Sequence, residues 1–285
     1  MRWMRRQSCP KSSSVSSRMV FRVLDFLLAA LGLIVLSPLL LVAILAIWLQ
    51  DFHSPFYIAE RVGRSNRPFR MVKLRSMTIG ADKTGVTSTS AGDSRITIVG
   101  KIVRKLKLDE VPQFWNVLMG SMSLIGPRPN VVKWGVELYT DEEMRLLSIP
   151  PGVSDFSSIV FSDEGQILKD AEDPDLEYNR IIRPWKSRLS LAYVDNRSVR
   201  LYVVLIILTV VSAVSRPKAL AWIQAELKRI GVDDELVRVA GREDPLVAHP
   251  PPGSNEIYSQ TDGRDDSNVS ITSPQHQAEV ARESV

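Results

Sequence analysis

The longest uncharged stretch of the chain, FLLAALGLIVLSPLLLVAILAIWLQ, runs from Phe26 to Gln50. Twenty-five residues in a straight helix extend ~37 Å, whereas the hydrocarbon core of a bilayer is about 30 Å thick. A buried core helix is the alternative, but a helix that is apolar on all sides is unusual in a domain of this size. The run is too long for a cleaved signal core, and no clear small-x-small site follows it. The sequence therefore predicts a membrane helix over residues 18–50.

Ser37 and Pro38 interrupt this run near its middle. Proline removes a backbone donor and clashes with the preceding turn, so it kinks a helix, and each half of ~18 Å is too short to span a bilayer. Basic residues flank the run on both sides, whereas a spanning helix should have one flank that is poorer in them. Two topologies stay open on these grounds: a helix-break-helix that re-enters one leaflet, and a kinked spanning helix.

The two ends of the chain have opposite charge. Residues 1–22 hold six basic residues and no acid, and residues 242–285 hold eight acids against three bases. We expect a flexible basic N-terminus over 1–17 and a disordered acidic tail over 241–285, because such compositions bury too little apolar surface to offset chain entropy. The single cysteine rules out an internal disulfide framework and any multi-cysteine metal site, and the three scattered histidines argue against a histidine-rich metal centre.

Residues 51–240 are expected to form the folded domain. PFYIAERVG and PFRMVKLRSM alternate apolar and polar residues and predict a hairpin around residues 63–68. Helices are expected over 101–107 and 112–119, the second ending at Gly120, and TDEE at 140–143 is a capping box. The apolar run 201–215 is short for a span and predicts contact with the membrane surface, with core packing as the alternative. Four tryptophans are candidates for an interfacial belt or for the core: Trp48, Trp134, Trp185 and Trp222.

The main chemical candidate is the adjacent carboxylate pair Asp109 and Glu110, in the sequence LDEVP. The ordinary interpretation is that these are the acids of a helix start, where the partial positive charge of the helix stabilises them. A carboxylate there could also attack a phosphoryl group while its neighbour binds Mg²⁺. An anionic nucleophile needs cations to approach a diphosphate, and Lys73, Arg104 and Arg128 are nearby candidates.

The order of motifs resembles the bacterial sugar transferase family of monotopic phosphoglycosyl transferases. The matching pieces are FRVLDFLLAALGLIVLSPLLL, ERVGRSNRPFRMVKLRSM, DSRITIVGKIVRKLKLDEVPQFWNVLMGSMSLIGPRP and PPGVSD, in the order of the family. The resemblance extends from about residue 18 to residue 209, about two-thirds of the chain. The block from Asp93 to Pro129 is the most specific of them.

The resemblance implies a role for each matching residue. Ser37 and Pro38 match the helix-breaking pair of the family, which implies a re-entrant helix with both ends in the cytoplasm. Asp109 matches the nucleophile, and Glu110 matches the second member of the dyad, associated with Mg²⁺; both are expected near the metal. Basic residues of the active site are matched by Lys73, Arg104 and Arg128. The implied fold is a mostly helical α+β domain with few short strands, mounted on one N-terminal re-entrant helix at the cytoplasmic face of the bacterial inner membrane.

The implied reaction moves a sugar-1-phosphate from a nucleotide-diphospho-sugar, expected to be a UDP-sugar, to a polyprenol phosphate. It passes through an aspartyl-phosphosugar on Asp109 and initiates surface-glycan assembly. The implied partners are the two substrates and inner-membrane lipid, with no nucleic acid. The sugar, the polyprenol length and the oligomeric state are not implied.

Two positions depart from the common pattern of the family. Residues 151–158 read PGVSDFSS where many relatives have PG-[IV]-T-G-x-x-Q, and Ser190 stands where many have aspartate. We hypothesise that Asp155 supplies the missing acidic function. Other interpretations of the chain are a non-catalytic membrane anchor that presents basic groups to anionic lipid, and an inactive scaffold. The register of the motifs and the intact carboxylate pair argue against both.

Overall fold

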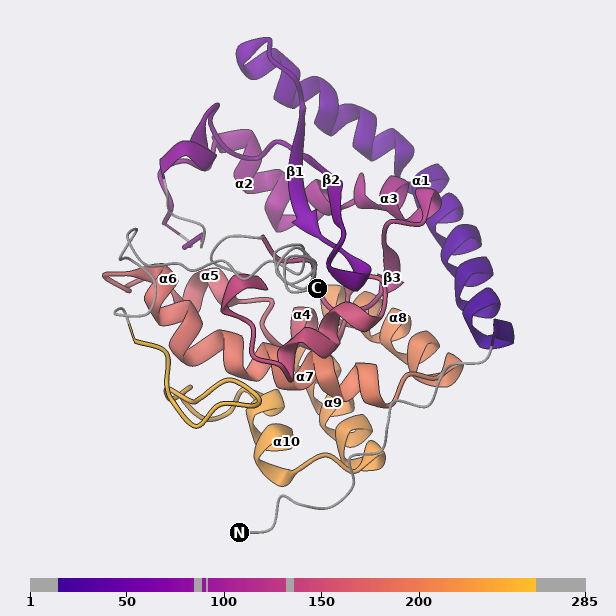
Figure 1. The fold of residues 1–285 in the computed structure, drawn as a ribbon. Coiled ribbons are helices and arrows are strands. Elements are labelled where there is room, and N and C mark those ends of the chain that lie inside the picture. The colour runs from indigo at the N-terminus through magenta and orange to yellow at the C-terminus, as the bar shows by residue number, and fades with distance from the viewer. Residues whose placement is uncertain (1–14, 85–88, 91, 132–135, 260–285) are drawn as a thin grey trace, which may run out of the picture.

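The computed structural model describes residues 15–84, 89–90, 92–131 and 136–259, and these form a mainly helical fold with few short strands (Figure 1). The predicted α+β class with mostly helices is confirmed at this level. The α-helices are α1 Val15–Asp51, α2 Ile98–Lys105, α3 Gln113–Met119, α4 Phe156–Val160, α5 Glu164–Ile167, α6 Pro174–Glu177, α7 Arg183–Asp195, α8 Val199–Val214, α9 Arg216–Ile230 and α10 Asp234–Gly241. The strands are β1 Phe56–Val62, β2 Pro68–Leu74, β3 Ser123–Ile125 and β4 Gly152–Ser154.

Helix α1 is long and apolar enough to cross a membrane, and most of its surface faces outward from the folded domain. It follows one edge of the molecule, and its axis changes direction about midway (Figure 1). The predicted helix-break-helix is wrong in one respect: the helix continues through Pro38 without interruption. The Ser37 hydroxyl donates to the Ile34 carbonyl at 2.8 Å, so the side chain satisfies an acceptor near the proline and the helix bends rather than ends.

The predicted hairpin is present. Strands β1 and β2 pair in antiparallel register from Phe56↔Leu74 to Val62↔Pro68. A second, two-stranded parallel sheet joins β3 to β4. At that pairing the backbones of Gly126 and Gly152 approach so closely that a Cβ on Gly152 would lie 2.1 Å from the Gly126 nitrogen. Glycine is required at this contact because a side chain would overlap the neighbouring backbone.

Several predicted helix boundaries are also confirmed. Helix α3 begins after Pro112 and ends at Gly120, whose φ of 84° is a left-handed C-terminal cap. The capping box is reciprocal: the Thr140 backbone donates to Glu143 at 3.1 Å, and the Glu143 backbone donates to the Thr140 hydroxyl at 3.2 Å. It opens a short 3₁₀ helix, Glu143–Ser148, rather than an α-helix.

The largest apolar core lies among α4, α7, α8, α9 and α10. Helix α8 contributes four buried side chains, Leu201, Tyr202, Leu205 and Leu208. Val203, Ile207, Val210 and Val214 of the same helix are exposed. Core packing therefore explains one face of the apolar run 201–215, and only the other face is free for the predicted membrane contact.

The expected disorder from residue 241 onward does not hold for residues 242–259. The His249 backbone donates to the Arg180 carbonyl at 3.0 Å, and the His249 ring lies 4.4 Å from the ring of Trp185. Arg188 of α7 donates to the Pro250 carbonyl at 2.9 Å. The three consecutive prolines at 250–252 reduce the entropy lost when this segment docks. The remainder of the predicted acidic tail, residues 260–285, and residues 1–14 of the predicted basic N-terminus lie outside the described residues. Residues 15–17 belong to α1.

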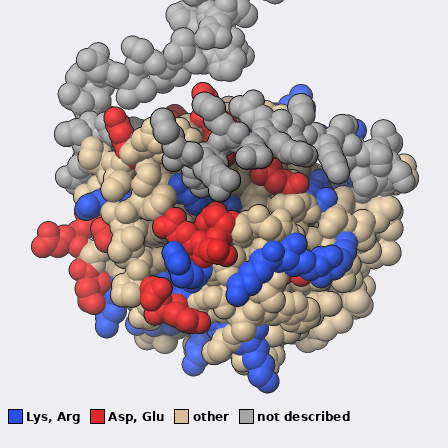
Figure 2. All heavy atoms as spheres, turned by 90° about the horizontal axis from the view of Figure 1, so that it is seen from below, with Lys and Arg blue, Asp and Glu red and all other residues tan. Residues whose placement is uncertain are grey.

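The surface on the α9 and α10 side of the molecule carries acidic and basic side chains close together (Figure 2). This face therefore has no single sign of charge. The tryptophans divide between the predicted roles: Trp185 is buried, Trp48 and Trp222 are exposed, and Trp134 lies outside the described residues.

Candidate active site

The carboxylate pair lies in a single 3₁₀ turn, Leu108–Glu110, between α2 and α3. Lys107 before it has a φ of 57°, a left-handed conformation that ends α2 and starts the turn. Leu108 and Val111 on either side of the pair are buried in a cluster with Leu74 of β2 and Ile47 of α1. These apolar anchors fix the turn against β2 and the membrane helix, while both carboxylates stay partly accessible.

Helix α2, which leads into the turn, is held from its other end. Thr97 accepts a hydrogen bond from the Gly100 backbone at 2.9 Å and so caps the helix. Gly100 packs directly on the backbone of residue 76, where a Cβ would lie 1.9 Å from the Ser76 carbonyl oxygen. Thr97 therefore has a structural role as the N-terminal cap of α2.

Arg128 forms an ion pair with Glu110. Burial alone would raise the pKa of Glu110, but Arg128 and Lys73 outweigh it and hold that pKa at about 2. The same carboxylate raises the pKa of Arg128. Pro127 and Pro129 restrict the backbone on both sides of this arginine, as expected from the sequence. Glu110 is thus an ionised partner of Arg128.

Asp109 has a different environment from its neighbour. Burial, together with the negative charge of Glu110, raises the pKa of Asp109 above its usual value, although Lys73, Arg104 and Arg128 act in the opposite direction. The two adjacent carboxylates therefore differ: Glu110 is stabilised as the anion, and Asp109 is the more basic of the two. A more basic carboxylate is the better nucleophile of the two, provided that it is deprotonated.

The cationic residues surround one cavity of about 1450 Å³. Lys73, Arg104, Glu110 and Arg128 all line it, so four of the five predicted polar site residues share one space. Asp109 is not itself among the lining residues, but Leu108 and Glu110 on either side of it are. Burial and the nearby cation Arg128 lower the pKa of Lys73 to about 8.

Sequence reasoning missed Arg61 as a site residue. Arg61 pairs across the hairpin with Phe69, and Lys73 pairs with Tyr57, so Arg61 and Lys73 lie on the same face of the two strands. Both line the cavity. Burial lowers the pKa of Arg61, and Arg128 acts in the same direction. The alternation of the predicted hairpin was the signal that could have placed Arg61 beside Lys73.

The bend of α1 reaches the same cavity. Leu36 and Leu39, which flank Ser37 and Pro38, are lining residues, as are Thr209 and Ser212 of α8. The apolar helix α1 and the basic residues around Glu110 therefore line the same cavity. Arg75, the residue after β2, ties the end of α1 to this region by pairing with Asp51.

The residues present are suited to a magnesium ion only together with an anionic substrate. Among the described residues, no group of three or more Asp, Glu, His or Cys side chains comes together as a metal cluster. Asp109 and Glu110 offer two carboxylates near the cations Lys73, Arg104 and Arg128, and Arg61 lines the same cavity. Mg²⁺ is commonly held by one or two carboxylates with substrate phosphates and water completing the shell. The excess of positive charge would oppose binding of the free ion.

The structure does not support the hypothesis that Asp155 supplies an acidic function to the site. Asp155 is fully buried and caps α4, accepting from the Ser158 backbone and hydroxyl at 2.8 Å each. It also accepts from the Ser157 hydroxyl at 2.8 Å and from the Ser190 hydroxyl at 2.5 Å. Both oxygens are thus engaged, and neither is free to face the cavity. The two positions that depart from the common pattern, Asp155 and Ser190, are in direct contact.

The fold and site together define a mainly helical protein with one long apolar helix whose bend lines a cationic cavity, which Glu110 of the carboxylate pair also lines. Its family model confirms and narrows this class. The chain belongs to the bacterial sugar transferase family, whose model matches residues 16–216.

Three curated relatives illustrate the likeness. A UDP-N-acetylgalactosamine-undecaprenyl-phosphate N-acetylgalactosaminephosphotransferase of Aeromonas hydrophila is 39% identical over 142 residues, covering 49% of this chain and 33% of the relative. A UDP-glucose:undecaprenyl-phosphate glucose-1-phosphate transferase of Caulobacter vibrioides is 45% identical over 109 residues, covering 38% and 41%. The exopolysaccharide production protein ExoY of Sinorhizobium fredii is 36% identical over 148 residues, covering 47% and 65%. The chain thus matches less than two thirds of the length of each.

Proposed function

We propose that this protein transfers a sugar-1-phosphate from a UDP-sugar to a polyprenol phosphate at the cytoplasmic face of the inner membrane, and that this step initiates surface-glycan assembly. The observation that carries the proposal is a cationic cavity lined by Glu110, the neighbour of Asp109, and also by the apolar helix α1. The basic residues of this cavity can bind the phosphates of a water-soluble diphosphate, and the apolar helix beside them gives access to a lipid-borne phosphate. The names of the relatives, which include UDP-sugar and undecaprenyl-phosphate, support the substrate classes.

In the proposed first step, a carboxylate oxygen of Asp109 attacks the phosphorus atom that bears the sugar. The bond from that phosphorus to the bridging oxygen of UMP breaks, UMP leaves, and an aspartyl-phosphosugar remains. In the second step, a phosphate oxygen of the polyprenol phosphate attacks the same phosphorus. The bond to Asp109 breaks, which gives the polyprenyl-diphospho-sugar and restores the carboxylate. One covalent intermediate lets the two substrates use the site in turn.

The residues of the cavity support the charge changes of both steps. Arg61, Lys73, Arg104 and Arg128 would bind the phosphate oxygens and reduce the repulsion between the substrate and Asp109. Arg128, held by Glu110 and by its two prolines, is the most rigid of these cations. Glu110 and Asp109 would hold Mg²⁺ together with the substrate, and the ion would supply further charge neutralisation on the leaving phosphate.

A re-entrant path for α1 is part of the proposal, and contacts at both ends of the helix support it. Near its start, Arg22 donates to the Val117 and Leu118 carbonyls. Asp25 accepts from the Leu124 backbone at 2.8 Å. At its end, Asp51 pairs with Arg75 of the same folded domain. A domain on one side of a bilayer can hold both ends of α1 only if the helix returns to the side from which it entered.

The test is turnover by the purified full-length protein in lipid nanodiscs that contain undecaprenyl phosphate. UMP release would be measured with a panel of UDP-sugars and Mg²⁺, and the protein would be analysed by mass spectrometry after reaction with the donor alone. We expect one or more donors to give UMP and a mass increase equal to one sugar-phosphate on the peptide that holds Asp109.

The matched variants are Asp109→Asn and Asp141→Asn, the second at an exposed position. Asp109→Asn should abolish both UMP release and the mass increase, while Asp141→Asn should keep both. A non-catalytic anchor predicts no release from the wild-type protein with any donor. An adduct on another residue, or turnover by Asp109→Asn, would refute the assigned nucleophile.

A further inference from the structure

A second polar cluster lines the same cavity and takes no part in the phosphate site. The Lys186 ammonium nitrogen of α7 lies 2.7 Å from a carboxylate oxygen of Glu164 on α5. The same nitrogen lies 5.5 Å from the ring centroid of Tyr178. All three residues line the cavity, and their side chains are partly accessible rather than sealed in the core.

The backbone that presents Tyr178 is unusual. Residues Tyr178–Ile182 form one π-helical turn between α6 and α7. Such turns cost stability relative to a regular α-helix and are frequent at functional sites. Here the turn widens the helix at the cavity wall, where Tyr178 and Asn179 are both lining residues.

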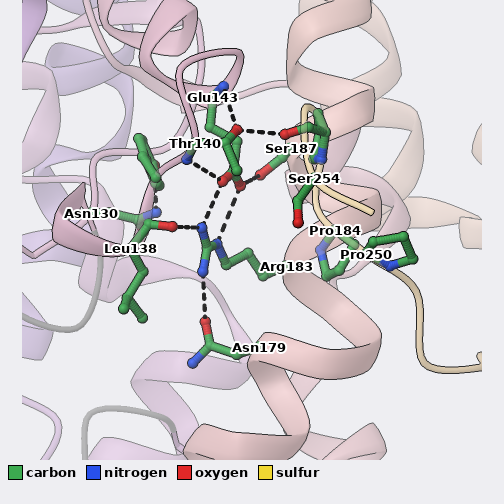
Figure 3. A network of polar contacts seen from close by, with 12 residues as sticks. Asn130, Leu138, Thr140, Glu143, Asn179, Arg183, Pro184, Ser187, Pro250 and Ser254 are labelled. Atoms are coloured by element: carbon green, nitrogen blue, oxygen red, sulfur yellow. Dashed lines mark hydrogen bonds and ion pairs between the residues drawn. The ribbon is translucent and has the colours of Figure 1, made fainter. Parts of the chain in front are cut away.

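A buried polar network fixes this turn in place (Figure 3). Arg183, the first residue of α7, donates to the Asn179 side chain at 3.4 Å and to Glu143 at 2.6 Å. Ser187 on the next turn of α7 donates to Glu143 at 2.6 Å. Glu143 is fully buried, so the network is shielded from water. The network therefore supports the turn that presents Tyr178 and the start of α7, the helix that holds Lys186.

The cluster lies close enough to the phosphate site to act on the same ligand. Glu164 raises the pKa of Arg128, although less than Glu110 does, and Arg128 in turn acts on Lys186. The paired charges of Glu164 and Lys186 cancel, so this wall adds little to the attraction of phosphate. It offers instead a carboxylate acceptor, an ammonium donor and the face of one aromatic ring.

That combination is the chemistry of carbohydrate recognition. Hydroxyl groups both donate and accept, so a carboxylate and an ammonium can bind neighbouring hydroxyls of one sugar ring. The apolar face of a sugar packs on an aromatic ring, and tyrosine provides such a surface with a polar tip. A uracil base could stack on the same ring, and the UMP measurement described below separates that occupant from the sugar.

We propose that Glu164, Lys186 and Tyr178 bind the sugar of the donor and set which sugar is accepted. This inference rests on the proposed function, because it names the part of the donor that occupies the second wall of the cavity. Glu164 and Lys186 hydrogen-bond ring hydroxyls, and Tyr178 packs on the ring. Because Arg128 and these three residues line one cavity, the sugar-bearing phosphate would lie between this wall and the carboxylate pair.

The test compares kcat/KM for pairs of donors that differ at one hydroxyl: UDP-glucose with UDP-galactose, and UDP-N-acetylglucosamine with UDP-N-acetylgalactosamine. The variants are Glu164→Gln and Tyr178→Leu, and the matched control is Glu172→Gln at an exposed position. Inhibition by UMP, which has no sugar, is measured for each protein.

We expect Glu164→Gln to change the preference within at least one epimer pair by about tenfold or more, because a site built to bond a hydroxyl discriminates strongly through that bond. UMP inhibition should stay within about twofold of the wild-type value, since UMP does not reach this wall. A purely structural role for the ion pair would lower all rates together and leave the preference unchanged.

Failure of the inference can be told from failure of the proposed function. If the wild-type protein releases UMP but both variants keep its donor preference, the sugar subsite is refuted and the transferase activity stands. Equal weakening of UMP inhibition and donor use would place the nucleotide, not the sugar, at this wall, and would also refute it. If Glu164→Gln does not fold, Tyr178→Leu, which leaves the ion pair in place, decides the question. No UMP release from the wild-type protein with any donor would end both proposals.

Discussion

Replacing Glu143 by alanine should destabilise the protein more than any substitution of an exposed acid. Its carboxylate is fully buried and accepts hydrogen bonds from the Thr140 backbone and from the side chains of Arg183 and Ser187. Glu143→Ala would leave the Arg183 guanidinium, itself only 5% exposed, without its ionic partner. Breaking a buried pair in this way costs about 3–5 kcal/mol.

The magnitude is large for a folded domain. About 1.4 kcal/mol corresponds to a factor of ten in an equilibrium constant, so the ratio of folded to unfolded protein should fall by at least about a hundredfold. Glu143→Gln keeps the size of the side chain and one carbonyl acceptor, so its loss should be smaller. The assay is equilibrium unfolding of the detergent-solubilised protein in urea, followed by the fluorescence of tryptophan, since Trp185 is buried two residues from Arg183.

The adjacent residue provides the control. Glu142 is about half exposed (46%) and lies 3.9 Å from Arg145 in a surface ion pair. Pairs of this kind contribute less than about 1 kcal/mol, so Glu142→Ala should shift the midpoint little. If Glu143→Ala and Glu142→Ala moved the unfolding midpoint equally, the buried network would not stabilise the fold, and the reasoning about its support of the π-helical turn would fail.

Three further results are expected. The kcat/KM for the donor should fall as the pH rises through about 8, because Lys73 loses its charge there. Lys73→Arg should move this fall to higher pH. An unchanged alkaline limb of the pH profile in the variant would count against Lys73 as a phosphate ligand. Gly152→Ala should lower the free energy of unfolding by about 1–3 kcal/mol, measured by thermal or urea unfolding, because its Cβ would overlap the Gly126 backbone. Gly92→Ala is the control, because a Cβ there meets nothing within 4 Å. Equal stability of the two variants would contradict the close approach of β3 and β4. Pro38→Ala should straighten α1 and move a tagged N-terminus toward the periplasm, as measured by accessibility labelling in spheroplasts. A tag that stays cytoplasmic would show that the contacts at the ends of α1, and not the proline, set the topology.

Local patterns were enough to predict the secondary structure around the site. The hairpin, the helix that begins after Pro112 and the capping box at Thr140 all follow from short-range rules about alternation, proline and reciprocal caps. The same is true of the apolar length of α1. The family itself was recognisable from the order of its motifs, because each motif combines residues with unusual local requirements.

The sequence was less informative where a helix is apolar on all its faces or where a segment has several possible partners. The run 201–215 is apolar throughout, yet only packing against the other helices decides that Leu205 is core and Val210 is exposed. Composition favoured disorder after residue 241, but α7 offers Arg188 and Trp185 as a surface on which residues 249 and 250 dock. Proline at position 38 predicted a break, and the surrounding helix absorbs it as a bend.

By itself, then, the sequence determined the elements, the apolar anchor and the adjacent carboxylates Asp109 and Glu110, since these depend on residues that are neighbours along the chain. Only the tertiary structure decided that Arg128 pairs with Glu110, that Arg61 joins the cations, and that Asp155 is closed off by serines. Charge pairing, burial and access to a cavity depend on distances between residues far apart in sequence. Those distances are fixed by packing, which no local pattern encodes.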